Sequence, residues 1–283
     1  MTGKLIAAGI FVALAANAAL SAPPGTGTTE QLPLFKKAVR SDKERYNFAA
    51  GKGAKFLPTP DGRSFYILWL PPSASPQKPP PVVFTLHGHG SWAFDEFFLW
   101  HKHIAEAGIG IVALQWWFGE GETPKDYYLP GQLAQIMNEI MRINTIRKNS
   151  VLAHGFSRGS ANIYGLAALD NRSEKFILLT VANAGKAGAD FPINRDIASG
   201  LFGQRPLEGT YWMTYAGARD PHPERDGIPG MRVAQDWIRR YGGTVKLAIE
   251  DQNGDHGGFH RNPANVKKAL DLFRQLLAEK AAR

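Results

Sequence analysis

Short apolar runs rich in β-branched and aromatic residues alternate with helical patterns along most of this chain of 283 residues. Such alternation is typical of repeated βαβ units. The runs predict strands at 65–70, 82–86, 110–115, 151–154, 176–181, 211–215 and 245–250, and helices near 96–107, 129–146, 158–169, 231–241 and 263–281. We therefore expect an α/β fold with a mostly parallel central sheet and helices on both of its faces.

The composition is that of an ordinary cored protein, with 44% hydrophobic and 20% charged residues. This excludes disordered, collagen-like and coiled-coil chains. A net charge of +8 is compatible with anionic partners, but no run of clustered Lys and Arg supports nucleic-acid binding, so we expect none. Cysteine is absent, which excludes disulfides, a thiol nucleophile and Cys-ligated zinc. With no internal repeat and no second composition regime, we predict one domain over residues 23–283.

The N-terminus has the features of a secretory signal over residues 1–22. Lys4 gives a positive start, residues 5–14 are uncharged and apolar, and small residues at 16–18 and 19–21 offer cleavage positions. An uncleaved anchor helix or a buried first helix is the alternative, although the apolar run is short for a membrane span. We expect an exported protein, secreted or periplasmic, without stable membrane anchoring after cleavage.

A Gly-Phe-Ser-Arg-Gly segment at 155–159 stands between the predicted strand 151–154 and the helix that follows it. A G-x-S-x-G segment in this place forms a tight turn whose serine projects above the sheet, while its glycines allow strand and helix to approach closely. Ser157 is therefore a candidate nucleophile, and the Arg158 N–H would face a developing oxyanion. The alternative is a glycine-rich helix start that is capped by serine.

With this motif the chain resembles the α/β-hydrolase family over nearly all of residues 23–283. In that family the nucleophile is followed by an acid and then by a histidine. Asp220 comes after the strand 211–215 in a G-x-x-D segment, and His256 lies in a glycine-rich loop after the strand 245–250. The order Ser157, Asp220, His256 agrees with the family. The resemblance implies the α/β-hydrolase fold and a serine hydrolase.

The chemistry of such a site assigns a role to each residue. A serine hydroxyl is a weak nucleophile at neutral pH, so His256 would take the proton of Ser157 as it attacks an acyl carbon. Asp220 would hold the imidazole tautomer and stabilise the imidazolium. The alternatives by position are Asp226 for the acid and His260 or His222 for the base.

A His-Gly-His-Gly turn at 87–90 follows the strand 82–86. Hydrolases of this fold often carry such a turn, and one of its backbone N–H groups completes the oxyanion hole. His89 is our first choice for this donor and Gly90 the second, since His89 replaces a glycine of the HGGG form. As a metal site the turn is poor, because two histidines at i, i+2 lack a third ligand nearby. We expect neither a metal nor an organic cofactor.

Aromatic residues follow two of the predicted strands. Trp92 and Trp116 lie just beyond strand ends, where ligands bind in open α/β sheets, so we predict that they line the substrate site. Aromatic walls favour aryl or hydrophobic acyl groups. Only about 26 residues separate Ala184 from Tyr211, which leaves no room for a large cap domain. An open site accepts bulky or polymeric substrates.

Arg158 directly follows the nucleophile, and this Ser-Arg pair resembles the elbow of the glucuronoyl esterases. Those enzymes carry a lysine after the second glycine, where this chain has Ser160. Arg158 either recognises an acidic substrate or forms a structural ion pair.

Together these features predict a secreted serine carboxylic-ester hydrolase that works through an acyl-enzyme. Its expected substrates are bulky aryl, plant-cell-wall or polyester esters. The alternatives are a serine peptidase or amidase of the same fold, or a non-catalytic binding protein that retains it.

Overall fold

The computed structural model describes residues 28–188 and 191–282, which form one eight-stranded sheet in the order β1-β2-β4-β3-β5-β6-β7-β8. The strands are β1 (Lys55–Pro58), β2 (Phe65–Trp69), β3 (Val82–Leu86), β4 (Gly110–Leu114), β5 (Val151–Phe156), β6 (Ile177–Asn183), β7 (Tyr211–Gly217) and β8 (Thr244–Asp251). The pairs from β4 through β8 are parallel, whereas β2 is antiparallel to both β1 and β4. The carboxyl ends of the parallel strands therefore meet at one edge of the sheet.

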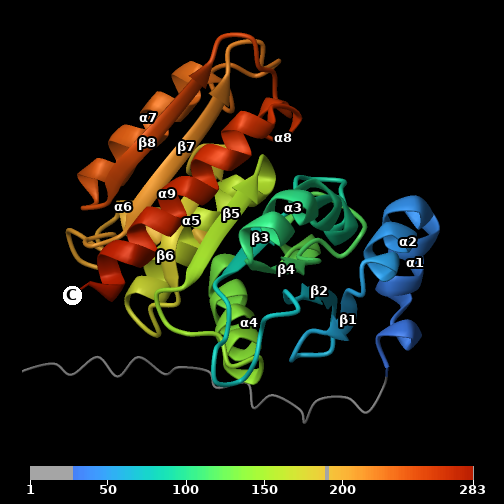
Figure 1. Cartoon of the computed structure of the whole chain (residues 1–283). Coiled ribbons are helices and arrows are strands. Elements are labelled where there is room, and N and C mark those ends of the chain that lie inside the picture. The colour runs from blue at the N-terminus through green and yellow to red at the C-terminus, as the bar shows by residue number, and fades with distance from the viewer. Residues whose placement is uncertain (1–27, 189–190, 283) are drawn as a thin grey trace, which may run out of the picture.

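Helices cover both faces of this sheet (Figure 1). They are α1 (Pro33–Ser41), α2 (Lys43–Gly51), α3 (Ala93–Ala107), α4 (Pro130–Ile143), α5 (Arg158–Asn171), α6 (Pro192–Ala198), α7 (Ile228–Arg240), α8 (Gly258–Arg261) and α9 (Pro263–Ala281). Helices α1, α2, α3, α8 and α9 pack on one face, and α4 to α7 pack on the other. This is the layered arrangement that right-handed βαβ crossovers produce.

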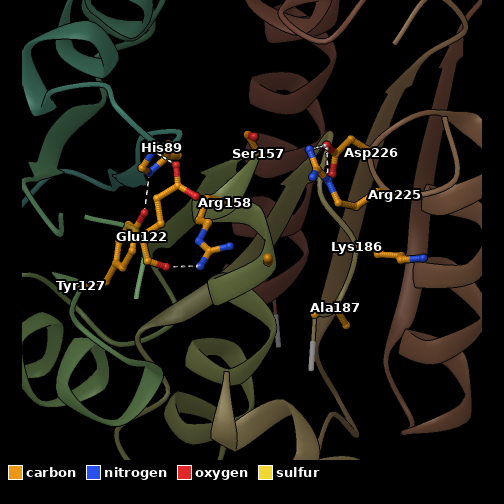
Figure 2. Close-up of a pocket in the computed structure, with 11 residues that line it drawn as sticks. His89, Glu122, Tyr127, Ser157, Arg158, Lys186, Ala187, Arg225 and Asp226 are labelled. Carbon is orange, nitrogen blue, oxygen red and sulfur yellow. Dashed lines mark hydrogen bonds and ion pairs between the residues drawn. The ribbon is translucent and has the colours of Figure 1, made fainter. Parts of the chain in front are cut away.

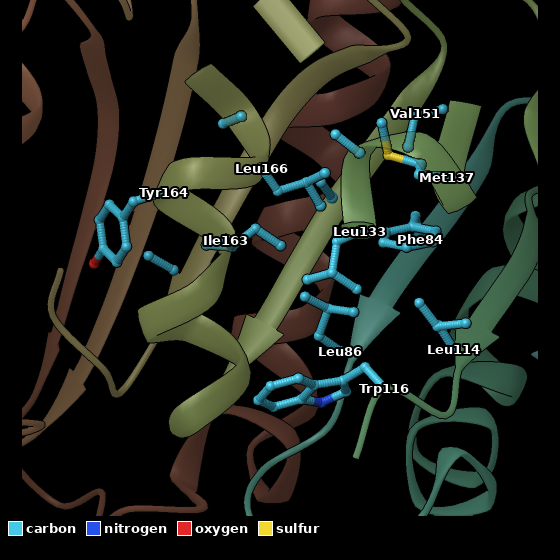
Figure 3. Packing of buried hydrophobic residues seen from close by; sticks show 14 of the residues in the cluster. Phe84, Leu86, Leu114, Trp116, Leu133, Met137, Val151, Ile163, Tyr164 and Leu166 are labelled. Carbon is cyan, nitrogen blue, oxygen red and sulfur yellow. The ribbon is translucent and has the colours of Figure 1, made fainter. Parts of the chain in front are cut away.

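The buried core lies on both sides of the sheet, because the inner strands are covered by helices twice. Along β5, Leu152 faces the layer of α3 and α9, while Val151 and Ala153 face the layer of α4 and α5. Figure 3 shows the second side, where side chains of α4 and α5 pack against those of β3, namely Leu133, Met137, Ile163, Leu166, Phe84 and Leu86. Near-continuous apolar strands in the sequence reflect this double burial.

The α/β fold with a mostly parallel sheet is confirmed, and each predicted strand and long helix is present, β3 and α9 with the predicted bounds and the others with shifted ends. The sequence analysis missed β1, α1, α2 and the short helices α6 and α8. Strand β1 is short, partly exposed and at the sheet edge, so it lacks a clear apolar pattern. In its described part, the segment between β6 and β7 contains one short helix, α6, which agrees with the absence of a large cap.

The predicted signal at residues 1–22 lies outside the described residues. Within the ranges that the structure describes, no helix has the length and apolar character needed to cross a bilayer.

Candidate active site

Ser157 occupies the turn between the end of β5 and the start of α5. Its backbone has φ 53° and ψ −115°, a conformation that L-residues rarely adopt. Gly155 and Gly159 allow this turn because they have no Cβ, so that strand and helix approach closely, as the motif predicts. A Cβ on Gly155 would lie 2.5 Å from the carbonyl oxygen of Gly159, and a Cβ on Gly159 would collide with the carbonyl oxygen of Leu86. The elbow thus depends on close backbone approach of β5, α5 and β3.

We expect Gly155→Ala to destabilise the fold by about 3 kcal/mol, because the new methyl group would meet backbone atoms that have no room to move. Gly131→Ala in α4 is a matched control, since nothing lies within 4 Å of a Cβ there and its change should stay within about 1 kcal/mol. Urea unfolding of both variants measures the difference. Equal stability of the two would contradict the close approach at the elbow.

The structure brings together the side chains of Ser157, His256 and Asp220 from the ends of β5, β8 and β7. His256 Nε2 lies 2.9 Å from Ser157 Oγ, and His256 Nδ1 lies 2.7 Å from Asp220 Oδ2. The Asp220 carboxylate is buried, and its Oδ1 accepts the backbone N–H of His222 at 2.8 Å. This second hydrogen bond fixes the carboxylate, so the imidazole is held from one side and directed at the hydroxyl on the other.

The alternatives that the sequence left open take other positions. His222 is exposed and contacts Asp220 through its backbone N–H. His260 is buried on α8 and faces Glu96 rather than the serine. Asp226 is closer: a carboxylate oxygen of it lies within 4.8 Å of the Asp220 carboxylate and of a His256 nitrogen, while Arg225 holds it in an ion pair. The geometry places Asp220 in contact with His256 and Asp226 beside them.

The turn at 87–90 packs directly against the elbow. A Cβ on Gly88 would lie 3.0 Å from the Phe156 ring and 3.5 Å from Ser157 Cβ, so this glycine lies next to the elbow. His89 lines the pocket in front of Ser157, and its imidazole contacts the Tyr127 hydroxyl and, at 3.2 Å, Glu122 Oε1. Gly90 is exposed with φ 71° and is not part of the pocket wall. Of the two predicted donors in this turn, His89 is the one beside the serine.

A pocket of about 700 Å³ opens in front of Ser157 (Figure 2). Besides Ser157 its wall consists of His89, Glu122, Tyr127, Arg158, Ala161, Lys186, Ala187, Gly188, Arg225 and Asp226. Five of these side chains are charged, so the site is more polar than the sequence suggested. Sequence reasoning did not find Tyr127 or Lys186, because they lie in long connections rather than directly at a recognisable motif.

Trp92 and Trp116 do not contribute to this wall. Trp116 is fully buried, and its indole N–H donates to the His87 carbonyl at 2.9 Å, so it supports the turn from behind. Trp92 is 8% exposed and packs on Trp117 with ring centroids 5.4 Å apart. The aromatic side chain that does face the pocket is Tyr127.

The Arg158 side chain crosses the pocket wall toward Tyr127, as Figure 2 shows. Its guanidinium lies 5.2 Å from the centre of the Tyr127 ring and 5.7 Å from that of Phe191, and it donates to the Glu122 carbonyl at 3.1 Å. These contacts fix the side chain beside the serine. Because Arg158 is the first residue of α5, its backbone N–H is also at the helix N-terminus, next to Ser157.

Two groups of side chains among the described residues have the composition of a metal site. They are Asp220 with Asp226 and His256, and Glu96 with His154 and His260. In the first group both imidazole nitrogens of His256 already have partners in Ser157 and Asp220. That group is therefore better suited to proton transfer than to metal binding.

No protein-family model and no curated protein matches this sequence. Solved structures match the fold. A hyperthermophilic esterase from Pyrobaculum calidifontis superposes with a TM-score of 0.57 at 11% identity, over 87% of this chain and 94% of that one. The Bacillus cereus carboxylesterase superposes with a TM-score of 0.53 at 15% identity, over 82% of this chain and 99% of that one. Esterase LipW from Mycobacterium marinum superposes with a TM-score of 0.57 at 14% identity, over 86% of this chain and 88% of that one. The chain therefore has the α/β-hydrolase fold.

Proposed function

We propose that this chain is a serine carboxylic-ester hydrolase in which Ser157, His256 and Asp220 form the catalytic triad. The observation that carries the proposal is the chain of two hydrogen bonds, 2.9 Å and 2.7 Å long, that joins the three side chains at the pocket. The strained backbone of Ser157 supports it, because such strain is common where a nucleophile must project toward substrate. The esterases among the structural neighbours also support it.

In this mechanism Ser157 Oγ attacks the acyl carbon while His256 Nε2 takes its proton. The alkoxide or phenoxide that leaves then receives this proton from His256, and an acyl-enzyme remains on Ser157. Water attacks the acyl-enzyme with His256 again as base, which releases the acid and restores the serine. Asp220 stabilises the imidazolium in both halves. The N–H groups of Arg158 and His89 donate to the oxyanion.

The substrates that we propose are bulky esters of aryl, plant-cell-wall or polyester type. A pocket of about 700 Å³ is in the range that holds a ligand of this size. Tyr127 offers one aromatic surface for an aryl group. The charged residues in the wall favour polar esters, such as those of cell-wall material, over long alkyl chains, because an alkyl chain would leave these groups poorly hydrated.

The test is hydrolysis of short-chain p-nitrophenyl esters, combined with a fluorophosphonate probe and mapping of the labelled peptide. We expect turnover and a single adduct on Ser157. An adduct without ester turnover, together with cleavage of a p-nitroanilide, would favour the peptidase or amidase alternative. Neither adduct nor turnover in folded protein would favour the non-catalytic binding protein.

Arg158→Ala separates the backbone of this residue from its side chain. The variant keeps the N–H at the start of α5, so kcat on p-nitrophenyl acetate should fall less than about tenfold. A rise in KM confined to esters that carry a carboxylate would assign the guanidinium to substrate recognition. A lower thermal midpoint with unchanged KM would assign it to structure, and loss of kcat on every ester would contradict the placing of the oxyanion donor in the backbone.

We also propose that the chain is exported, secreted or periplasmic, on the strength of the signal pattern at residues 1–22. Expression of the full chain in a bacterial host, with fractionation and mass measurement of the N-terminus, tests this. A mature chain that begins between residues 19 and 23 in the exported fraction is the expected result. An intact N-terminus in the cytoplasm would contradict it.

A further inference from the structure

Three titratable side chains meet in the core on the α3 side of the sheet, outside the pocket. They are Glu96 of α3, His154 of β5 and His260 of α8, which together we call the Glu96 cluster. Glu96 Oε2 lies 3.3 Å from His154 Nδ1 and 3.9 Å from His260 Nε2. All three side chains are at least nine-tenths buried, and none lines the pocket. The proposed triad mechanism therefore assigns these three residues no role.

Hydrogen bonds from neighbouring elements fix the orientation of Glu96 and His154 in this cluster. Glu96 Oε2 accepts from the Thr85 hydroxyl at 2.6 Å and from the Trp100 indole N–H at 3.2 Å. Since the single hydroxyl hydrogen of Thr85 goes to Glu96, its 2.8 Å contact with His154 Nδ1 requires a hydrogen on that nitrogen. The Asn183 amide lies 3.2 Å from His154 Nε2. The His154 ring is thus held from both sides.

The Glu96 carboxyl group is buried among hydrogen-bond donors. Burial alone would raise its pKa, but electrostatic and hydrogen-bonding contributions from His154, with smaller ones from His260 and Thr85, outweigh burial and lower the pKa to about 2. A charge in the core is strongly unfavourable once it loses its partners. His154 is therefore held in place, since its shift would leave the carboxyl group poorly compensated. His260 contacts the cluster by packing: its ring nitrogens make no hydrogen bond among the described residues, and burial lowers its pKa to about 3.

The cluster connects the two segments that carry the nucleophile and the base. His154 precedes Ser157 by three residues on β5, and His260 follows His256 by four residues. The Phe259 ring, next to His260, stacks on His154 with centroids 5.6 Å apart and an angle of 19° between the rings. The loop that carries His256 thus contacts the nucleophile strand twice, once at the site and once in the core.

We propose that Glu96 is a positioning residue: it fixes the ring of His154, on which Phe259 and His260 pack, and so holds the loop of His256 at the correct distance from Ser157. This inference rests on the proposed function, because it assigns Glu96 a part in the same reaction. It follows from the geometry that the carboxylate acts on the rate of proton transfer and not on the binding of substrate, since the pocket wall lies elsewhere.

The same three side chains also form a donor set for a divalent cation. The hydrogen bonds that Thr85 and Trp100 donate to Glu96 Oε2 use the oxygen that such an ion would need. This favours a network of hydrogen bonds and ion pairs. Treatment of the wild-type protein with EDTA decides between the two: unchanged activity supports the network, and loss of activity that zinc restores would overturn it.

The main test is Glu96→Gln, which keeps the shape of the side chain and removes its charge. We expect kcat on p-nitrophenyl acetate to fall roughly 10- to 100-fold with KM changed less than about threefold, because a small displacement of reacting groups costs this much in rate. The rate of fluorophosphonate labelling at Ser157 should fall by a similar factor. His260→Leu should lower kcat as well, because it removes the ring that packs on His154 and Trp100.

Ile140→Ala is the matched control for general loss of stability. Ile140 is fully buried near the C-terminal end of α4, where the chain turns back toward the start of β5, far along the sheet from the site. This variant should lower the thermal midpoint and leave kcat unchanged. If Glu96→Gln and His260→Leu keep the wild-type kcat below their melting temperatures, the positioning role is wrong. If the wild type itself shows no turnover that depends on Ser157, the proposed function has failed instead.

Discussion

Replacing Ser157 with alanine should lower kcat for ester hydrolysis by roughly 10⁶-fold, the loss expected when the nucleophile of a triad is removed. His256→Ala should have an effect of similar size, because triad residues act as a unit and the hydroxyl is a weak nucleophile without its base. Steady-state turnover of a p-nitrophenyl ester measures both, with active-site titration to exclude traces of wild-type protein. If His260→Ala lowers kcat more than His256→Ala does, the assignment of His256 as the base is wrong.

The folded state should survive these changes. Alanine at position 157 keeps the strained φ of 53°, so the thermal midpoint of Ser157→Ala should stay close to that of the wild type. Ser157→Gly is the informative companion, because glycine adopts positive φ without a steric penalty. We expect it to be as inactive as Ser157→Ala and more stable by about 1 kcal/mol in urea unfolding. A less stable glycine variant would contradict the strain at the elbow.

Asp220→Asn should lower kcat by roughly 10⁴-fold, since the amide no longer favours the imidazole tautomer that accepts the serine proton. Asp226→Asn should lower kcat less than about tenfold, because Asp226 is paired with Arg225 and the imidazole nitrogen that faces the acids bonds to Asp220. Turnover measured at several pH values compares the two variants on the same ester.

The double variant tests whether Asp226 supports His256 when Asp220 is missing. Its carboxylate lies within 4.8 Å of the imidazole, so the residual activity of Asp220→Asn should fall further when Asp226 is also replaced by asparagine. If Asp226→Asn lowers kcat more than Asp220→Asn does, Asp226 and not Asp220 is the acid of the triad. Equal activity of the double variant and Asp220→Asn would show that Asp226 has no such part.

The sequence was sufficient to place Ser157, Asp220 and His256 near one another, because each follows a strand of a parallel sheet and the carboxyl ends of such strands share one edge. Its motif also located the elbow, since few sequences tolerate that turn. The residues of the pocket wall could not be predicted in this way. Tyr127 is placed at the site by a β-bridge between its segment and Trp117, and no local sequence pattern predicts this contact across a long connection.

The direction of side chains after a strand end was equally hard to read. Trp92 and Trp116 follow strands as ligand-binding residues do, but whether such a ring turns toward the pocket or the core depends on the packing around it. Here both rings turn toward the core: Trp116 donates its indole N–H to the His87 carbonyl, and Trp92 packs on Trp117. In the same way, α2 has no apolar stripe and forms through its contacts with α3, so periodicity alone missed it.

The position of β8 makes activity sensitive to partial unfolding. This strand lies at the edge of the sheet, pairs with β7 alone, and leads directly into the loop of His256. A chain in which β8 has detached from this edge no longer holds its base beside Ser157. Turnover therefore requires the edge strand, and under mild denaturation it should disappear when this edge detaches, before the tryptophan fluorescence of the inner core changes.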